Sequence, residues 1–230
     1  MSALRLCFAS FLFASAVAST GCPSATTTPG ISPKPPVVEV KVDRAAVRAK
    51  LAERRQVMFD RFLAYREGRV YPINELPGGG FRHVWVDNYG NLCAAATLIS
   101  GDWGRPASGA IARDNVETKV ADVTSGEIYE WILMSGLAKH ELVAIQVPGW
   151  RGNDPIEIDP GPGEPSARDQ EVTRLYEIYV DVERQLTSLW DESLDEATDA
   201  LMKRPDLAKK LLRDEIAGPG RFATIAMVDG

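Results

Sequence analysis

The feature that most constrains the fold is an apolar stripe at helical spacing between residues 166 and 189. Ser166 and Asp169 open it with the S-x-x-D pattern of a capping box. Apolar residues then recur every three or four positions: Val172, Leu175, Tyr176, Tyr179, Val182, Leu186 and Leu189. This period predicts an amphipathic α-helix. The stripe covers about two and a half heptads, fewer than a coiled coil needs, so we expect it to pack on a core. A partner-binding or dimer face is the alternative.

Other segments also have a helical pattern. Residues 43–67 begin with a possible N-cap, Asp43, and Gly68 follows them as a stop signal. Residues 127–134 have the apolar density of a buried helix. Residues 193–203 and 205–214 predict two shorter helices, the second with Pro205 in its first turn. Residues 140–146 fit either a short helix or a strand.

Two apolar runs in the middle of the chain predict a β-hairpin. Residues 81–87 and 92–99 flank the loop Asn88-Tyr89-Gly90, which has glycine in the left-handed position. This three-residue loop places Trp85 opposite Cys93, whereas a four-residue loop would shift the register. Residues 222–228 predict a final strand that pairs with the hairpin. We therefore expect an α+β fold in one globular domain, residues 42–230. It would have a small antiparallel sheet built on the hairpin and covered by several helices, with a helical C-terminal half.

Residues 1–21 predict a secretory signal peptide. One charged residue, Arg5, precedes an apolar stretch from Leu6 to Ala18, and small residues follow. The stretch is about 13 residues long, whereas a helix that crosses the hydrocarbon core needs roughly 20. We therefore expect this segment to be removed and not to remain as a transmembrane anchor.

The residues around Cys22 resemble the lipobox of bacterial lipoproteins. In the run Ala18-Ser19-Thr20-Gly21-Cys22, a small residue precedes the cysteine. The resemblance implies that Cys22 becomes the first mature residue and is lipidated on its sulfur and its amine. Three acyl chains exceed what stable anchoring requires. In this family, a residue other than Asp after the cysteine, here Pro23, usually accompanies a location in the outer membrane.

A second cleavage site competes with the lipobox. Ala16-Val17-Ala18 fits the A-x-A rule of ordinary signal peptidase, with cleavage before Ser19. The product would be a secreted soluble protein, in which Cys22 and Cys93 could form a disulfide.

Residues 22–41 predict a tether. Pro23 to Pro36 are rich in Ser, Thr and Pro and lack an apolar period. Such a segment favours extended polyproline II at roughly 3.1 Å per residue, so it could hold a domain up to ~60 Å from a bilayer. We expect a protein of the bacterial cell envelope that faces the periplasm or the surface. Its partners would be the membrane, through the lipid anchor, and an envelope protein or a cell-wall component.

Charge and composition exclude several function classes. The chain has 26 basic and 32 acidic residues, a net charge of −6, which argues against nucleic acid as a partner. Two histidines and three cysteines leave no room for a zinc finger or a multi-histidine centre, so we expect no metal and no cofactor. The acidic residues Asp154, Glu157 and Asp159 lack the order of a calcium loop. Gly78-Gly79-Gly80 lacks the Lys of a phosphate loop.

Cys93 is the one candidate nucleophile, because lipidation would consume Cys22. In the hairpin, His83 would be its diagonal neighbour, with Cβ atoms roughly 7 Å apart. A second arrangement places Cys93 at the start of a helix, residues 94–99, and His140 at the head of a strand. That order resembles the papain-like NlpC/P60 wall hydrolases, which implies a cysteine nucleophile and a histidine base. We favour a thiol packed in the core and assign no catalytic residue.

The sequence thus predicts a lipid-anchored protein of the cell envelope with a non-enzymatic binding or interaction domain. The alternative is a periplasmic cysteine-dependent hydrolase or thiol enzyme that acts through Cys93.

Overall fold

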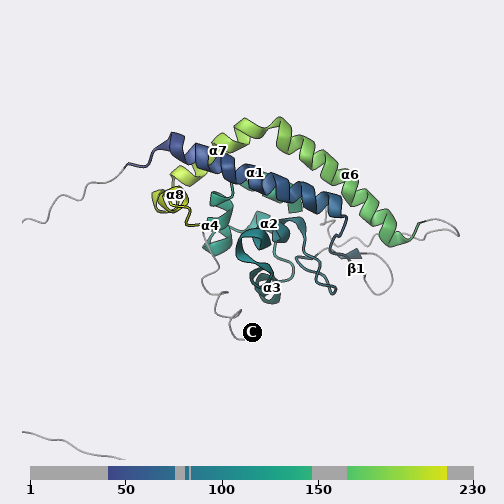
Figure 1. The fold of residues 1–230 in the computed structure, drawn as a ribbon. Coiled ribbons are helices and arrows are strands. Elements are labelled where there is room, and N and C mark those ends of the chain that lie inside the picture. Colours follow the sequence, from purple (N-terminus) through teal and green to yellow (C-terminus); the bar gives the residue numbers. More distant parts are fainter. Residues whose placement is uncertain (1–40, 76–80, 83, 147–164, 217–230) are drawn as a thin grey trace, which may run out of the picture. The chain divides into compact units, whose positions relative to one another are not determined.

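The computed structural model describes residues 41–75, 81–82, 84–146 and 165–216, and this part of the chain is mostly helical (Figure 1). The helices are α1 (Arg44–Gly68), α2 (Ala94–Trp103), α3 (Arg105–Asp114), the 3-10 turn η1 (Val120–Asp122), α4 (Gly126–Met134), α5 (Lys139–Gln146), α6 (Ala167–Ser188), α7 (Trp190–Met202) and α8 (Pro205–Leu212). Over the same residues, extended structure is limited to the antiparallel pair β1 (Asn74–Glu75) and β2 (Phe81–Arg82) and one bridge between Val86 and Leu92. The expected α+β fold with a sheet is therefore wrong.

The helix signals at both ends of the domain are confirmed. The carboxylate of Asp43 accepts a hydrogen bond from the backbone N–H of Ala45 at 2.9 Å and so caps α1. This helix ends at Gly68, and Arg69 after it has a left-handed conformation, with φ 50°. At the start of α6 the hydroxyl of Ser166 accepts from the backbone N–H of Asp169 at 3.2 Å. The same hydroxyl donates to the Asp169 carboxylate at 2.7 Å, which completes the capping arrangement.

The predicted hairpin is correct only around its loop. Gly90 has a left-handed φ of 82°, and the backbone N–H of Cys93 donates to the carbonyl of Trp85 at 2.9 Å, as the three-residue loop requires. After Leu92, however, the chain forms α2 and not a second strand. The run Ala94-Ala95-Ala96 strongly favours a helix, and α2 is buried on several sides, so its apolar residues show no helical period.

The structure describes two further segments, and a third lies outside the described residues. The ambiguous residues 140–146 belong to the helix α5. Helix α3 was not predicted, although Ala107, Ala110 and Ile111 recur in it at helical spacing. The final strand expected at residues 222–228 lies outside the described residues.

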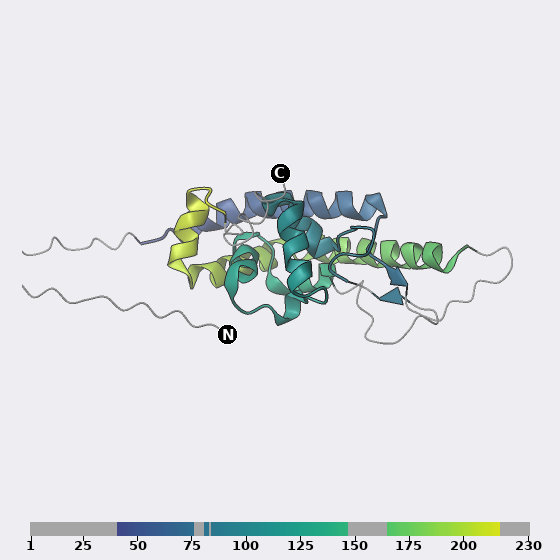
Figure 2. The same cartoon turned by 90° about the horizontal axis from the view of Figure 1, so that it is seen from below.

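Helix α1 is the central element of the packing. It contacts α2, α6, α7 and α8, and Figures 1 and 2 show it running beside α6 and α7. Its later turns pack in a large cluster with α2, α3 and α6, through Met58, Phe62 and Tyr65. Its first turns pack through Val47 and Leu51 in a second cluster with α4, α7 and α8. The first helix of the domain is thus enclosed by the last ones.

Candidate functional site

Cys93 lies at the N-cap of α2, inside the core. Its sulfur accepts a hydrogen bond from the backbone N–H of Ala96 at 3.4 Å, and its side chain is part of the main apolar cluster. Burial raises the pKa of the thiol to about 11, although hydrogen bonds from Ala96 and Gln146 partly oppose this. The thiol is therefore protonated at neutral pH, whereas the thiolate is the nucleophilic form. This environment matches the packing interpretation of Cys93.

The structure does not give Cys93 a histidine partner within the described residues. His140 is exposed on α5, and its Nδ1 lies 3.3 Å from the carboxylate of Glu196 on α7. The strand on which the papain-like interpretation placed His140 is a helix, so that part of the prediction is wrong. His83 lies outside the described residues. Near Cys93 lie the rings of Tyr65 and Tyr179, which meet edge to face with their centroids 5.5 Å apart.

A buried ion pair connects α1 with α5. The guanidinium of Arg55 is fully buried and donates to both oxygens of Glu141, at 2.7 and 2.6 Å. Arg55 also donates to the carbonyls of Gly136 and Leu186, at 3.3 and 3.2 Å. Its guanidinium carbon lies 4.5 Å from the ring centroid of Trp190. Glu141, Gly136 and Leu186 are buried and Trp190 is half-buried, so the pair positions helices.

A second buried carboxylate, Asp102, lies near the C-terminal end of α2. It accepts hydrogen bonds from Arg54, from Arg61 at 2.8 Å and from the indole N–H of Trp131 at 2.7 Å. Burial by itself raises the pKa of Asp102, but the hydrogen bonds and charges of the two arginines, together with Trp131, outweigh it and lower the pKa. The two arginines of α1 compensate the charge of the carboxylate, and Trp131 of α4 donates to it. Asp102 therefore joins three helices, which indicates a structural role.

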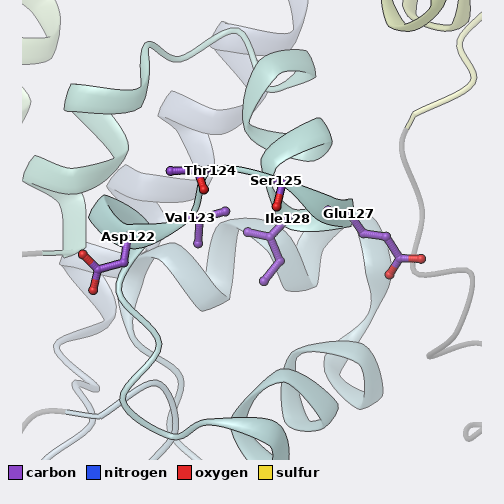
Figure 3. A pocket seen from close by; sticks show the side chains of 7 residues that line it. Asp122, Val123, Thr124, Ser125, Glu127 and Ile128 are labelled. Atoms are coloured by element: carbon purple, nitrogen blue, oxygen red, sulfur yellow. The ribbon is translucent and has the colours of Figure 1, made fainter.

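A concave surface lies where η1 leads into α4. The hollow has a volume of about 510 Å³, and Figure 3 shows the seven residues that line it, Asp122 to Ile128. Thr124 and Ser125 contribute hydroxyl groups, while Val123 and Ile128 contribute an apolar floor that packs against the main core cluster. The volume falls in the range of ligand-binding pockets. We call this surface the Glu127 hollow.

The Glu127 carboxylate is the distinctive group of the hollow. Its Oε2 atom is buried and has no hydrogen-bond partner among the described residues. Asp122 lies at the opposite end of the lining, as Figure 3 shows. A buried carboxylate oxygen without a donor carries a desolvation cost that a cationic group would offset. Figure 3 shows the Glu127 side chain pointing away from Val123 and Ile128, so this carboxylate lies at the edge of the hollow.

Little in the amino-acid sequence points to this hollow. Residues 120–128 contain no motif, and Glu127 reads as the first residue of a buried helix. The one available signal was the Thr124-Ser125-Gly126 run before a charged residue, which is typical of a turn that enters a helix. Its concavity depends on the packing of α4 against other helices, which no local pattern reports.

Several predicted sites lie beyond the described residues or have no counterpart in them. Cys22 and the acidic residues Asp154, Glu157 and Asp159 lie outside the description. Within the described ranges, no group of three or more potential metal ligands is present. The helices in these ranges include none with the length and apolarity that a membrane span requires.

Comparison of the chain with protein-family models, curated proteins and solved structures gave no match.

Proposed function

We propose that the protein is anchored to a bacterial envelope membrane through lipid on Cys22 and presents a helical binding domain at the end of the predicted tether. The observation that carries this proposal is the lipobox-like run Ala18–Cys22, followed by the Ser/Thr/Pro-rich residues up to Pro36. The partner is an envelope protein or a cell-wall component. The membrane that best fits Pro23 is the outer membrane.

The start of the first helix supports this arrangement. Helix α1 begins at Arg44 with Asp43 as its cap, a few residues after the end of the predicted tether. A linker over residues 22–41 in extended polyproline II would reach about 60 Å, enough to hold a partner-binding domain clear of a lipid surface. Anchoring through charge alone is disfavoured, because the net charge of the chain is −6.

The environment of Cys93 favours binding over thiol chemistry. A thiol enzyme requires a sulfur with a lowered pKa and access to substrate. Cys93 has the opposite properties: it is 6% exposed, and burial raises its pKa to about 11. A cysteine-dependent hydrolase is therefore the weaker of the two functions.

Lipidation is tested by expressing the full chain in a Gram-negative host and measuring the mass of its N-terminal peptide. We expect a mature chain that begins at Cys22 and carries a diacylglycerol and an amide-linked acyl group. Cys22→Ala should remove both modifications, so the mature lipidated chain is lost and the unmodified precursor accumulates.

Cys93→Ala is the matched control, because it removes the other cysteine of the mature chain and should leave lipidation unchanged. A mature chain that begins at Ser19 without acyl groups would contradict the proposal and support the secreted form. Crosslinking of the anchored wild-type chain in whole cells then tests the binding role. Recovery of no specific envelope partner under several crosslinking chemistries would contradict it.

A further inference from the structure

The loop at residues 87–91 presents an exposed aromatic ring on a backbone that is held by hydrogen bonds. The buried carboxylate of Asp87 accepts from the backbone N–H groups of Tyr89 and Asn91, at 2.9 and 2.8 Å, and from the Asn91 amide at 2.9 Å. Gly90 supplies the left-handed turn, with φ 82°. Tyr89 is nevertheless 78% exposed. A tyrosine whose backbone is already fixed loses little conformational entropy when a partner covers it.

Two guanidinium groups from other elements lie at this loop. Arg105, the first residue of α3, donates to the carbonyl of Gly90 at 2.5 Å. Arg168, in the first turn of α6, has its guanidinium carbon 5.7 Å from the centroid of the Tyr89 ring. A carbonyl oxygen and an aromatic ring are both uncharged, so these contacts position the two guanidiniums without neutralising them.

The exposed side of α3 continues this positive surface. Arg105, Gly109 and Arg113 follow one another at intervals of four residues, so they lie on one side of the helix, and both arginines are exposed. The Nη1 atom of Arg113 lies 3.6 Å from the position that a Cβ atom on Gly109 would occupy. Helix α3 packs on α2, on the side away from α1 (Figures 1 and 2). We call Tyr89, Arg105, Arg113 and Arg168 together the Tyr89 surface.

The three guanidiniums of the Tyr89 surface have no carboxylate partner among the described residues. Most other described arginines do have one, as Arg44 has in Asp199 at 2.8 Å. The chain carries 32 acidic and 26 basic residues, so carboxylates are in excess and these arginines still lack them. A guanidinium binds a carboxylate through two parallel hydrogen bonds. The Tyr89 surface therefore fits a partner that supplies carboxylates.

We propose that the Tyr89 surface binds an extended acidic segment of a partner protein. This inference names the chemistry of the partner of the proposed binding domain and rests on that proposal. Arg105 and Arg113 are about 12 Å apart along the axis of α3, and carboxylates four residues apart on an extended strand are separated by ~13 Å. Tyrosine and arginine are the residue types that dominate affinity at protein–protein interfaces. The net charge of −6 disfavours nucleic acid as the occupant.

The test measures binding of poly-L-glutamate to the purified full-length chain in detergent, by thermophoresis at low and high salt. We expect saturable binding that weakens as salt is added. Arg113→Glu should weaken it at least about fivefold, and Tyr89→Ala about threefold, whereas Arg113→Lys should retain most of the affinity. Arg184→Glu is the matched control, because it makes the same change in net charge at a side chain of α6 that is 72% exposed. The control should lower the affinity less than about twofold.

Thermal unfolding of each variant separates a lost contact from a lost fold, and the exposed positions should leave the midpoint unchanged. No binding by the wild-type chain, or equal losses in Arg113→Glu and Arg184→Glu, would overturn the proposal. Tighter binding of polyphosphate than of poly-L-glutamate would overturn it in favour of a phosphate-bearing partner. The mass of the N-terminal peptide does not depend on this surface, so a failure here is distinguishable from a failure of the proposed anchoring.

Discussion

The guanidinium of Arg55 and the carboxylate of Glu141 meet face to face in the interior, with two hydrogen bonds of 2.7 and 2.6 Å. Their side chains are 0% and 4% exposed, so both charges have left water completely. Burial of a charge is costly unless a partner compensates it, and here each is the main partner of the other. Residues 86 positions apart in the sequence are thereby fixed to each other.

Removing one member of this pair should be far more harmful than removing both. We expect Glu141→Ala to lower the free energy of unfolding by about 3–5 kcal/mol, because the buried guanidinium is left without its counter-ion. The double variant Arg55→Met with Glu141→Leu should recover much of that loss. Urea unfolding followed by circular dichroism measures both. A loss below ~1 kcal/mol in the single variant would show that the charges are not buried together.

Gly136 should tolerate no side chain. Its φ is +84°, and a Cβ atom there would meet the carbonyl oxygen of Leu51 and lie 2.5 Å from the backbone nitrogen of Arg55. We expect Gly136→Ala to cost more than ~2 kcal/mol, since both the left-handed backbone and the close approach to α1 oppose it. Gly68→Ala is the control, because nothing lies within 4 Å of its Cβ position. That variant should be neutral or slightly stabilising, and thermal unfolding compares the two.

The thiol of Cys93 should make stability depend on alkaline pH. Burial raises its pKa to about 11, whereas an unfolded cysteine titrates near pH 8.5. The unfolded chain therefore loses its proton first, so stability is full below about pH 8.5 and falls as the pH rises toward 11. The loss attributable to Cys93 should reach ~3 kcal/mol. Because buried tyrosines also titrate at high pH, the readout is the difference in slope between the wild type and Cys93→Ala. Identical slopes would count against a buried thiol.

Asp102 should contribute to stability against acid. Burial opposes its ionisation, but Arg54, Arg61 and Trp131 outweigh this and lower its pKa. The contribution is therefore present above the pKa of an unfolded aspartate, about 3.9, and is lost as the pH falls through the lower folded value. We expect Asp102→Asn to cost ~2–4 kcal/mol at neutral pH and to shift acid unfolding to higher pH.

Asp181→Asn is the control for Asp102, because Asp181 pairs with Arg184 on the surface, where the side chains are 62% and 72% exposed. Its effect should be below ~1 kcal/mol. Equal acid midpoints for the two variants would exclude the proposed role of Asp102.

The parts of the fold that the sequence predicts are those in which one helix face is apolar and its ends carry capping residues. Asp43 and Ser166 mark two helix starts correctly, since a cap is a local hydrogen bond. Helix α2 was mistaken for a strand because burial on several sides removes the periodic pattern. The local register at Trp85 and Cys93 was nevertheless correct, since the loop alone determines it.

The candidate site was beyond sequence reasoning for a related reason. Cys93 drew attention as the lone thiol, but its burial depends on α1 and α6, which are distant in the sequence. Glu127 carries no local signal, since the absence of a donor at its Oε2 atom follows only from the packing around α4. The burial of Cys93 and the lack of a donor at Glu127 depend on contacts between helices. The spacing of residues within a single helix does not reveal such contacts.

Arg44, the first residue of α1, donates to Asp199 on α7 at 2.9 Å, across 155 positions of the chain. The apolar face of α1 that carries Val47 and Leu51 is likewise covered by α7 and α8. Among the described helices α1 is synthesised first, and this face is not fully covered until α4, α7 and α8 have been made. Such a connectivity delays burial of this one face of α1 and keeps it accessible to chaperones until the later helices emerge.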